Sequence, residues 1–181
     1  MANKNFDNLD IIIGDCILKN AKAQEALYKE FYGYAISVAL LYTTNREEAG
    51  EIVNDSFMKV FSEIRKLDNT KSFKAWFRKI VINTAIDKFR RNLKHKDSQE
   101  LPMWLPSCSP GALSTLTASD IITMVSTLPP IHKVVFCLYD VEGFDHKEIA
   151  KRIGIPESSS RVYLTRARKR LRELYEINFN D

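Results

Sequence analysis

Hydrophobic residues recur three and four positions apart over most of this chain, which is the spacing of helices that bury one face. Strand-like alternation is not present over any useful length, so the pattern predicts an all-α fold. The helices that it predicts cover about 22–42, 47–66, 73–92, 120–127, 131–140, 145–152 and 156–175.

Polar and turn-forming residues mark where these helices should begin and end. Thr44 or Asn45 can cap the helix after it, whose first turn holds acids that suit the positive end of a helix. Asp145 stands three residues before Glu148, which is the spacing of a capping box. Gly154 suits the left-handed residue that closes a helix, so a tight turn is expected before the last helix.

The helical pattern collapses over 93–118, where proline, serine and threonine are frequent. A stretch of this length without periodicity is unusual inside a compact domain, so we expect a flexible linker joining two helical domains. The apolar run 101–105 within it either packs against a domain or docks on a partner. The expected organisation is a leader over 1–20 that is loose to about residue 15, a helical bundle over 21–92, the linker over 93–118 and a helix-turn-helix domain over 119–176.

Charge is unevenly distributed along the 181 residues, although the formal net charge is only +4. Between Phe73 and Lys96 a single acid, Asp87, stands among eight lysines and arginines. A second basic segment lies in the last predicted helix. Such clusters matter more than the total charge for a polyanionic partner such as a nucleic acid.

Cysteine and histidine positions argue against several classes of site. Cys16, Cys108 and Cys137 are widely spaced and fit neither a disulfide framework nor a zinc site. The histidines lack a matching serine or cysteine arrangement, and no glycine-rich phosphate loop is present, so neither an enzyme nor a cofactor nor a metal is expected. No secretion signal or membrane-spanning run is visible, which favours a reducing, cytoplasmic location without membrane insertion.

The last helix gives the strongest functional signal. A tight turn precedes it and its buried stripe is regular, so it can stand out from its domain and enter a major groove. Arg161 is the candidate for base readout, because a guanidinium can bind guanine bidentately. A solvated basic helix end is the alternative. Further candidates for contacts with bases or phosphates are Ser158, Ser159, Val162, Tyr163, Thr165, Arg166, Arg168 and Lys169.

Two earlier helices carry weaker signals. Glu51, Asn54 and Asp55 share one outward face, for which the charge pattern alone favours a solvated surface. The third helix combines aromatic, amide and cationic side chains, a mixture that suits melted DNA because rings stack on unpaired bases. The alternative is that the tryptophan is a core residue and that the cations are ordinary surface residues that bind nothing. The residues concerned are Trp76, Lys79, Asn83, Asp87 and Arg90.

Several runs of sequence together resemble bacterial sigma factors of the sigma-70 family. Two runs resemble conserved region two, and one of them is similar to the pattern FxxWLxxIxxNxxxD. Three short runs resemble region four. Two such regions with a linker where a third domain would sit resemble the extracytoplasmic-function branch, over about residues 21–174. The runs are 46–57 and 72–87 for region two, and 142–144, 148–150 and 164–168 for region four.

The resemblance implies a role for each surface. Glu51, Asn54 and Asp55 match the positions that dock on the clamp helices of the polymerase β′ subunit, which replaces the solvated-surface interpretation. The final helix corresponds to the part that binds the minus-thirty-five promoter element. The part that captures and melts the minus-ten element would comprise Asp68, Asn69, Lys71, Phe73, Trp76, Lys79 and Asn83. The residues on its duplex side would be Asp87, Lys88, Arg90 and Arg91.

The implied partners are core RNA polymerase, through its β′ clamp helices and its β subunit, and promoter DNA in duplex and melted form. The linker would run through the polymerase core, and an inhibitory anti-sigma factor is a plausible further partner. The chain departs from the family where residues 158–160 replace the usual Gly-Thr-Val start of the last helix, which allows a repositioned helix start. A second departure is Tyr163, which stands where an arginine is common.

The expected function is a promoter-specificity subunit that binds core polymerase and directs promoter recognition, DNA melting and initiation. One alternative is a stand-alone helix-turn-helix regulator that binds duplex DNA, usually as a dimer. Such a regulator would not need the basic and aromatic third helix. The other alternative is a nucleic-acid enzyme, against which the absence of a metal-binding carboxylate cluster argues.

Overall fold

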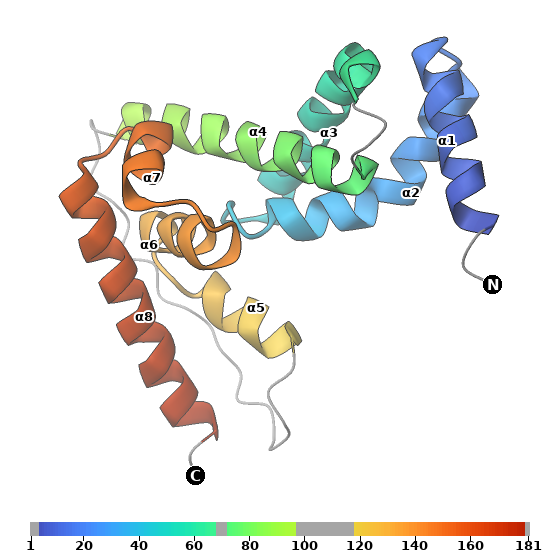
Figure 1. Cartoon of the computed structure of the whole chain (residues 1–181). Coiled ribbons are helices and arrows are strands. Elements are labelled where there is room, and N and C mark those ends of the chain that lie inside the picture. Colours follow the sequence, from blue (N-terminus) through green and yellow to red (C-terminus); the bar gives the residue numbers. More distant parts are fainter. Residues whose placement is uncertain (1–3, 68–71, 97–117, 180–181) are drawn as a thin grey trace. The chain divides into compact units, whose positions relative to one another are not determined.

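The computed structural model describes residues 4–67, 72–96 and 118–179, and within these ranges all regular structure is helical (Figure 1). The predicted all-α class is therefore confirmed. The described residues fall into two compact units. One holds helices α1 to α3 and α4 as far as Ala85, and the other holds the rest of α4 with α5 to α8. The expected linker and its apolar run 101–105 lie outside the described residues, apart from its two ends, which are helical.

The first helix corrects the expectation of a loose leader. Helix α1 covers Lys4–Ile17 and packs against α2. It buries the side chain of Cys16, whose thiol pKa is raised chiefly by burial. Asn20 then caps α2, because its side chain accepts hydrogen bonds from the backbone of Lys22 and Ala23. The leader is thus a helix joined to the bundle by a capped turn.

Helices α2 (Ala21–Ala39) and α3 (Arg46–Glu63) pack against each other and form the centre of the first unit. Asn45 is the cap of α3, with a hydrogen bond of 2.7 Å from the Glu48 backbone to its side chain. The last turn tightens into a short 3-10 helix over Ile64–Lys66. The apolar residues that recur at three-four spacing along α3 and its 3-10 turn are all buried: Ala49, Val53, Phe57, Val60 and Ile64.

Aromatic rings fill the core where α2, α3 and the start of α4 (Phe73–Lys96) meet. Phe77 is fully buried, and its ring contacts those of Phe31, Phe57 and Phe73 at centroid distances of 6.1, 4.8 and 5.7 Å. Such ring pairs contribute about 0.5–1.5 kcal/mol each beyond the area that they bury. This cluster fixes the start of α4 against the two helices that precede it.

Besides the end of α4, the described residues of the second unit form three short α-helices and one long one. Helices α5 (Ala118–Ser126) and α6 (Pro130–Phe136) are followed by a π-helical turn, η2, over Cys137–Val141. This turn lies inside the segment that periodicity predicts as one helix. Cys137 is buried in it, as expected for an apolar run.

Helices α7 (His146–Ile153) and α8 (Glu157–Phe179) form the predicted helix-turn-helix (Figure 1). Asp145 and Glu148 make a capping box at the start of α7, with bonds of 2.7 and 3.1 Å. Gly154 closes α7 with φ of 77°, a left-handed conformation that favours glycine. Both signals read from the sequence are therefore confirmed. The buried stripe of α8 packs against α6 and α7 through Leu164 and Ala167.

Candidate nucleic-acid interface

The outward surface of α3 holds the three residues expected to meet a protein partner. Glu51, Asn54 and Asp55 are all exposed. Met58 follows at the next three-four step, and its side chain is 71% exposed. We call these four residues the α3 face. Single exposed hydrophobic side chains are common on protein surfaces, and methionine is enriched at protein interfaces, so Met58 is compatible with a protein contact at this face.

A residue of α2 orients one member of the α3 face. The Tyr28 hydroxyl donates to Asn54 Oδ1 at 2.9 Å. The Tyr28 ring is fixed in turn by the buried Phe57, at a centroid distance of 4.6 Å. Burial raises the pKa of Tyr28, so the phenol stays protonated and able to donate.

The polar residues predicted in α4 lie along one stripe of that helix. Trp76, Lys79, Asn83, Asp87 and Arg90 follow at steps of three, four, four and three residues. Trp76, Asn83 and Asp87 are half-buried, whereas Lys79 and Arg90 are exposed. Asp87 pairs with Arg90 at 3.4 Å. The half-buried tryptophan is thus neither core nor fully solvated, which suits a ring surface that a base can reach.

Phe73 does not lie on this surface. Its side chain is only 4% exposed and packs between the rings of Phe31 and Phe77. It also contacts Trp76 at a centroid distance of 6.0 Å. The expectation that it contacts the minus-ten element is corrected to a supporting position beneath Trp76, because the aromatic core takes its ring. Lys88 is half-buried and Arg91 exposed, while the remaining candidates, Asp68, Asn69 and Lys71, lie outside the described residues.

Helix α8 presents most of its predicted DNA contacts to solvent. Exposed are Ser158, Arg161, Val162, Thr165, Arg166, Arg168 and Lys169. Arg161, Thr165 and Arg168 follow at steps of four and three residues and share one edge of the helix. Ser159 and Tyr163 are half-buried. Tyr163 turns toward α6, where its ring meets that of His132 at a centroid distance of 5.3 Å.

Two arginines of α8 already hold carboxylates in this structure. Arg161 pairs with Glu157 one turn earlier on the same helix, and both are exposed. An exposed pair of this kind stabilises by only about 0–1 kcal/mol, so a phosphate or base can replace the glutamate. Arg168 instead reaches Asp140 of η2 with two bonds of 2.5 and 3.1 Å. The hydrogen bond with Asp140 raises the pKa of Arg168.

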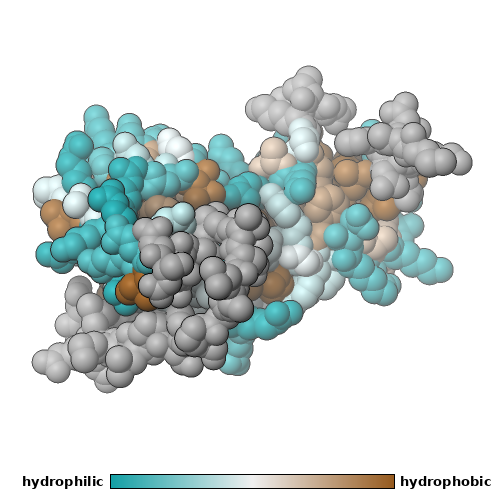
Figure 2. Space-filling view, turned by 90° about the horizontal axis from the view of Figure 1, so that it is seen from below, coloured by the Kyte–Doolittle hydropathy of each residue, from teal (hydrophilic) through white to brown (hydrophobic). Residues whose placement is uncertain are grey.

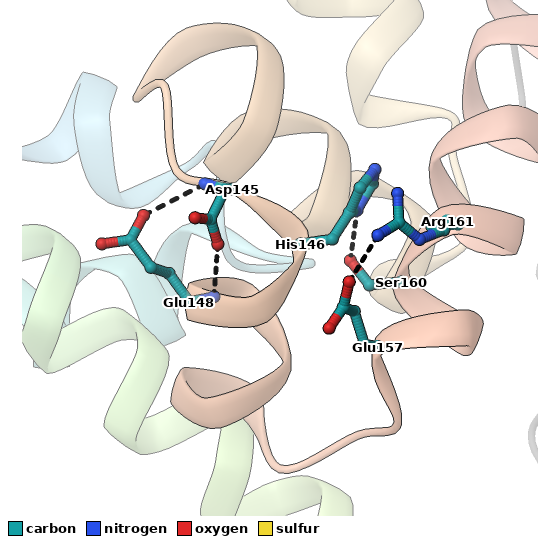
Figure 3. A network of polar contacts seen from close by, with 6 residues as sticks. All are labelled: Asp145, His146, Glu148, Glu157, Ser160 and Arg161. Atoms are coloured by element: carbon teal, nitrogen blue, oxygen red, sulfur yellow. Dashed lines mark hydrogen bonds and ion pairs between the residues drawn. The ribbon is translucent and has the colours of Figure 1, made fainter.

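A polar contact joins the start of α8 to the start of α7 (Figure 3). Ser160 is fully buried, and its hydroxyl lies 2.9 Å from Nδ1 of His146. The His146 ring stacks on Tyr139 at a centroid distance of 4.6 Å. Burial lowers the pKa of His146, and the nearby charge of Arg161 lowers it further. The ring is therefore held toward its neutral form.

In the view of Figure 2, hydrophobic residues reach the surface in small groups between larger hydrophilic areas. Among the described residues there is no group of three or more histidine, cysteine, aspartate or glutamate side chains placed to hold a metal ion. In the same part of the chain, no helix combines the length and the apolar character needed to cross a membrane.

Comparison with known proteins decides between the alternatives. The family profile described as Sigma-70 region 2 matches residues 27–94, and the one described as Sigma-70, region 4 matches residues 118–171. The two profiles cover the two helical parts of this chain in the order that the sequence motifs predict.

The chain belongs to the extracytoplasmic-function branch of the sigma-70 family.

Similar proteins agree with this assignment. The RNA polymerase sigma factor SigV of Bacillus subtilis is 29% identical over 146 residues, which is 80% of this chain and 83% of that protein. The ferric citrate uptake sigma factor FecI of Escherichia coli is 27% identical over 150 residues, covering 79% and 85% respectively. The sigma factor RpoE of Bartonella quintana, solved with an anti-sigma factor, superimposes with a TM-score of 0.51 at 19% identity, covering 85% and 97%, which shows the fold.

As a sigma factor, the chain binds core RNA polymerase and directs promoter recognition and transcription initiation. It is an initiation factor and not an enzyme. The alternative of a stand-alone helix-turn-helix regulator is not favoured.

Three residues of the candidate surfaces escape prediction from the sequence. Met58 continues the three-four spacing of the α3 face, so that spacing could have shown it. Tyr28 and His146 contact Asn54 and Ser160, which lie 26 and 14 positions away in the chain. No pattern along a single helix indicates such partners.

Proposed function

We propose that this sigma factor uses three surfaces in three tasks: the α3 face for polymerase, the α4 stripe for the minus-ten element, and α8 for the minus-thirty-five element. The observation that carries the proposal is the arrangement of the candidate residues. Among the described candidates, those of the α3 face and of the α4 stripe each share one side of their helix, and all candidates are exposed or half-buried apart from Phe73. The division of the chain at 20, 92 and 118 into leader, bundle, linker and helix-turn-helix domain is part of the proposal.

For polymerase binding, the α3 face offers two carboxylates, an oriented amide and an apolar side chain. Carboxylates suit a partner surface that carries lysine or arginine, and such charge pairs set register and the rate of encounter. Met58 adds an apolar contact of the kind that is found at the centre of interfaces. Partner helices with basic and apolar residues, as clamp helices are expected to provide, would complement this set.

For the minus-ten element, the α4 stripe combines a ring with donors and cations. An unpaired base can stack on the half-buried Trp76, which contributes about 1–3 kcal/mol for each stacked base. Lys79 and Asn83 lie one and two turns further along the same stripe and can meet the strand that carries that base. Lys88, Arg90 and Arg91 would meet the phosphates of the adjoining duplex.

For the minus-thirty-five element, α8 is the recognition helix and its N-terminal half enters the major groove. Arg161 reads a base edge after releasing Glu157. Ser158, Val162 and Thr165 lie close enough along the exposed side to touch neighbouring bases or phosphates. Lys169 and Arg166 would contact phosphates.

Two domains joined by a linker bind promoter DNA bivalently when polymerase holds both of them. Attachment of one domain then raises the effective concentration of the other, so modest individual affinities combine. The proposal therefore requires tight promoter binding by the holoenzyme and weak binding by the free chain.

Reconstitution with core polymerase tests the proposal. The purified chain is added to core enzyme, and start sites are mapped on genomic DNA by sequencing the 5′ ends of transcripts. We expect a new set of start sites that share two sequence elements. A mobility-shift assay of the free chain on the same promoters is the control, and selective binding without polymerase would contradict the proposal.

Regulation and location extend the same proposal. The solved sigma factor RpoE is bound to an anti-sigma factor, and we propose such an inhibitor for this chain too. We propose that the chain acts in the cytoplasm, where core polymerase and promoter DNA are present. Co-purification with polymerase from the soluble fraction tests the location, and recovery with envelope fractions alone would contradict it.

A further inference from the structure

The contact between Ser160 and His146 belongs to none of the three proposed binding surfaces. Ser160 is the only serine of the α8 start that is fully buried, whereas Ser158 is exposed and Ser159 half-buried. Its hydroxyl would lose its hydrogen bonds to water at such a site, at a cost of about 1–3 kcal/mol if no partner were present. Nδ1 of His146, at 2.9 Å, is that partner (Figure 3).

His146 is itself fixed from two further sides. As the first residue of α7, it follows the capping box that Asp145 makes with Glu148, which sets the backbone at that point. Its ring stacks on Tyr139 of η2 with an interplanar angle of 27°. The hydrogen bond to Ser160 is therefore anchored on a side chain that has little freedom to follow a movement of α8.

Tyr139 also connects this contact to a second one further along α8. The guanidinium of Arg168 lies 5.4 Å from the centre of the Tyr139 ring, while it pairs with Asp140 in the same turn. Helix α8 is thus held at Ser160 by His146, and two turns later at Arg168 by Asp140. His146 and Asp140 are themselves linked, because Tyr139, which precedes Asp140, stacks on His146. Two directional contacts at different heights restrict the sliding and rotation of α8, in addition to its apolar packing.

We propose that Ser160 and His146 are positioning residues for promoter recognition, whose hydrogen bond sets where the first turns of α8 stand and so which base edge Arg161 reaches. The inference rests on the proposed role of α8 as the recognition helix. Arg161 follows Ser160 directly in the chain, so a rotation of α8 that breaks the buried bond moves the Arg161 side chain as well. Contacts of this kind work only when held within about 0.5 Å of their geometry.

A double-mutant cycle in the reconstituted holoenzyme tests the pair. The readout is base preference, taken as the ratio of initiation on a wild-type promoter to initiation on promoters with single base changes in the upstream element. Ser160→Ala and His146→Phe each remove the hydrogen bond, and the phenylalanine keeps the stack on Tyr139. We expect each variant to lower the ratio about two- to ten-fold, which is the usual net effect of one hydrogen bond.

The two variants should not act independently. Because both remove the same bond, the double variant is expected to lower the ratio no further than the stronger single variant. His146→Asn can place an amide atom near the position of Nδ1 and should recover part of the ratio. Preference for bases of the downstream element should stay unchanged in every variant, since α4 is untouched.

Glu173→Gln is the matched control, because it removes a partner of Arg170 from the exposed side of the same helix. It should leave both preferences at the wild-type level. The inference would be overturned if the double variant lowered the ratio by the product of the two single effects. It would also be overturned if the single variants folded and kept the wild-type ratio. If the wild-type chain gives no promoter-specific initiation at all, the proposed function fails first, and the role of the pair falls with it.

Discussion

The Tyr28 hydroxyl donates a hydrogen bond of 2.9 Å to Oδ1 of Asn54, joining α2 to the exposed face of α3. The hydrogen bond holds the acceptor oxygen of the Asn54 amide on the side of Tyr28. The bond orders a side chain before any partner arrives, and such preorganisation reduces the entropy lost on binding.

Replacing Tyr28 with phenylalanine should weaken polymerase binding without disturbing the bundle. The ring keeps its contact with Phe57, so the free energy of unfolding changes little. The lost orientation of Asn54 should raise the Kd for core polymerase about two- to ten-fold. Fluorescence titration of the labelled chain with core enzyme measures this Kd. Tyr32→Phe, one turn along α2, is the control, and an equal effect of both variants would count against a role for the bond.

Reversing the charge of the α3 face should abolish polymerase binding. Glu51→Lys combined with Asp55→Lys replaces two attractive charges by two repulsive ones on an exposed surface, so the fold should stay intact. Circular dichroism checks the fold and co-precipitation checks the binding. The control is Glu25→Lys with Glu30→Lys, which makes the same charge change on exposed positions of α2. Co-precipitation of the α3 variant at the wild-type level would refute the assignment.

Removing the guanidinium of Arg161 should weaken recognition of the upstream element. We expect Arg161→Ala to cost about 1–3 kcal/mol of promoter binding and to relax the base preference at one position. Footprinting of the holoenzyme on promoters with that position varied measures both effects. Arg172→Ala, near the other end of α8, should weaken binding without changing base preference. Retention of the full preference by Arg161→Ala would exclude it as the residue that contacts the base.

Acid should destabilise the helix-turn-helix unit through His132. Burial lowers the pKa of His132 from its ordinary 6.5, and the charge of Arg166 lowers it further. The folded state therefore resists a proton that the unfolded state accepts, so this stabilisation is complete above about pH 6.5 and declines as the pH falls toward the lower folded pKa. Urea unfolding from about pH 7.5 to about pH 5 measures the slope. His132→Phe should reduce the slope and leave the part that comes from His146, whose pKa is lowered as well. An unchanged slope would assign the acid sensitivity to another group.

Much of the fold follows from the sequence because its determinants are local. The helix spacing, the Asn45 cap, the capping box of Asp145 with Glu148 and the left-handed Gly154 each depend on residues within one turn of each other. The helical leader is different. Leu9, Ile13 and Cys16 do follow the three-four spacing of a helix face, so the sequence carries a helical signal that the prediction of a loose leader overlooks, and α1 packs against α2.

The candidate surfaces also differ in how far local sequence predicts them. The α3 face and the α4 stripe follow from spacing on a single helix, together with the family resemblance. The motif predicts Phe73 on the DNA surface, but its ring packs against those of Phe31 and Phe77 in the core. Likewise, a serine at 160 gives no sign of its partner until α7 and α8 are brought together.

Helix α4 runs without a break over 24 residues from Phe73 to Lys96. At about 1.5 Å of rise for each residue, Trp76 and Arg90 stand about 21 Å apart along its axis. Stacked base pairs are spaced by about 3.4 Å, so this interval equals about six of them. If Trp76 holds an unpaired base and Arg90 a phosphate, this helix acts as a ruler. It would fix how far the boundary between open and closed strands lies from the captured base at every promoter that the chain serves.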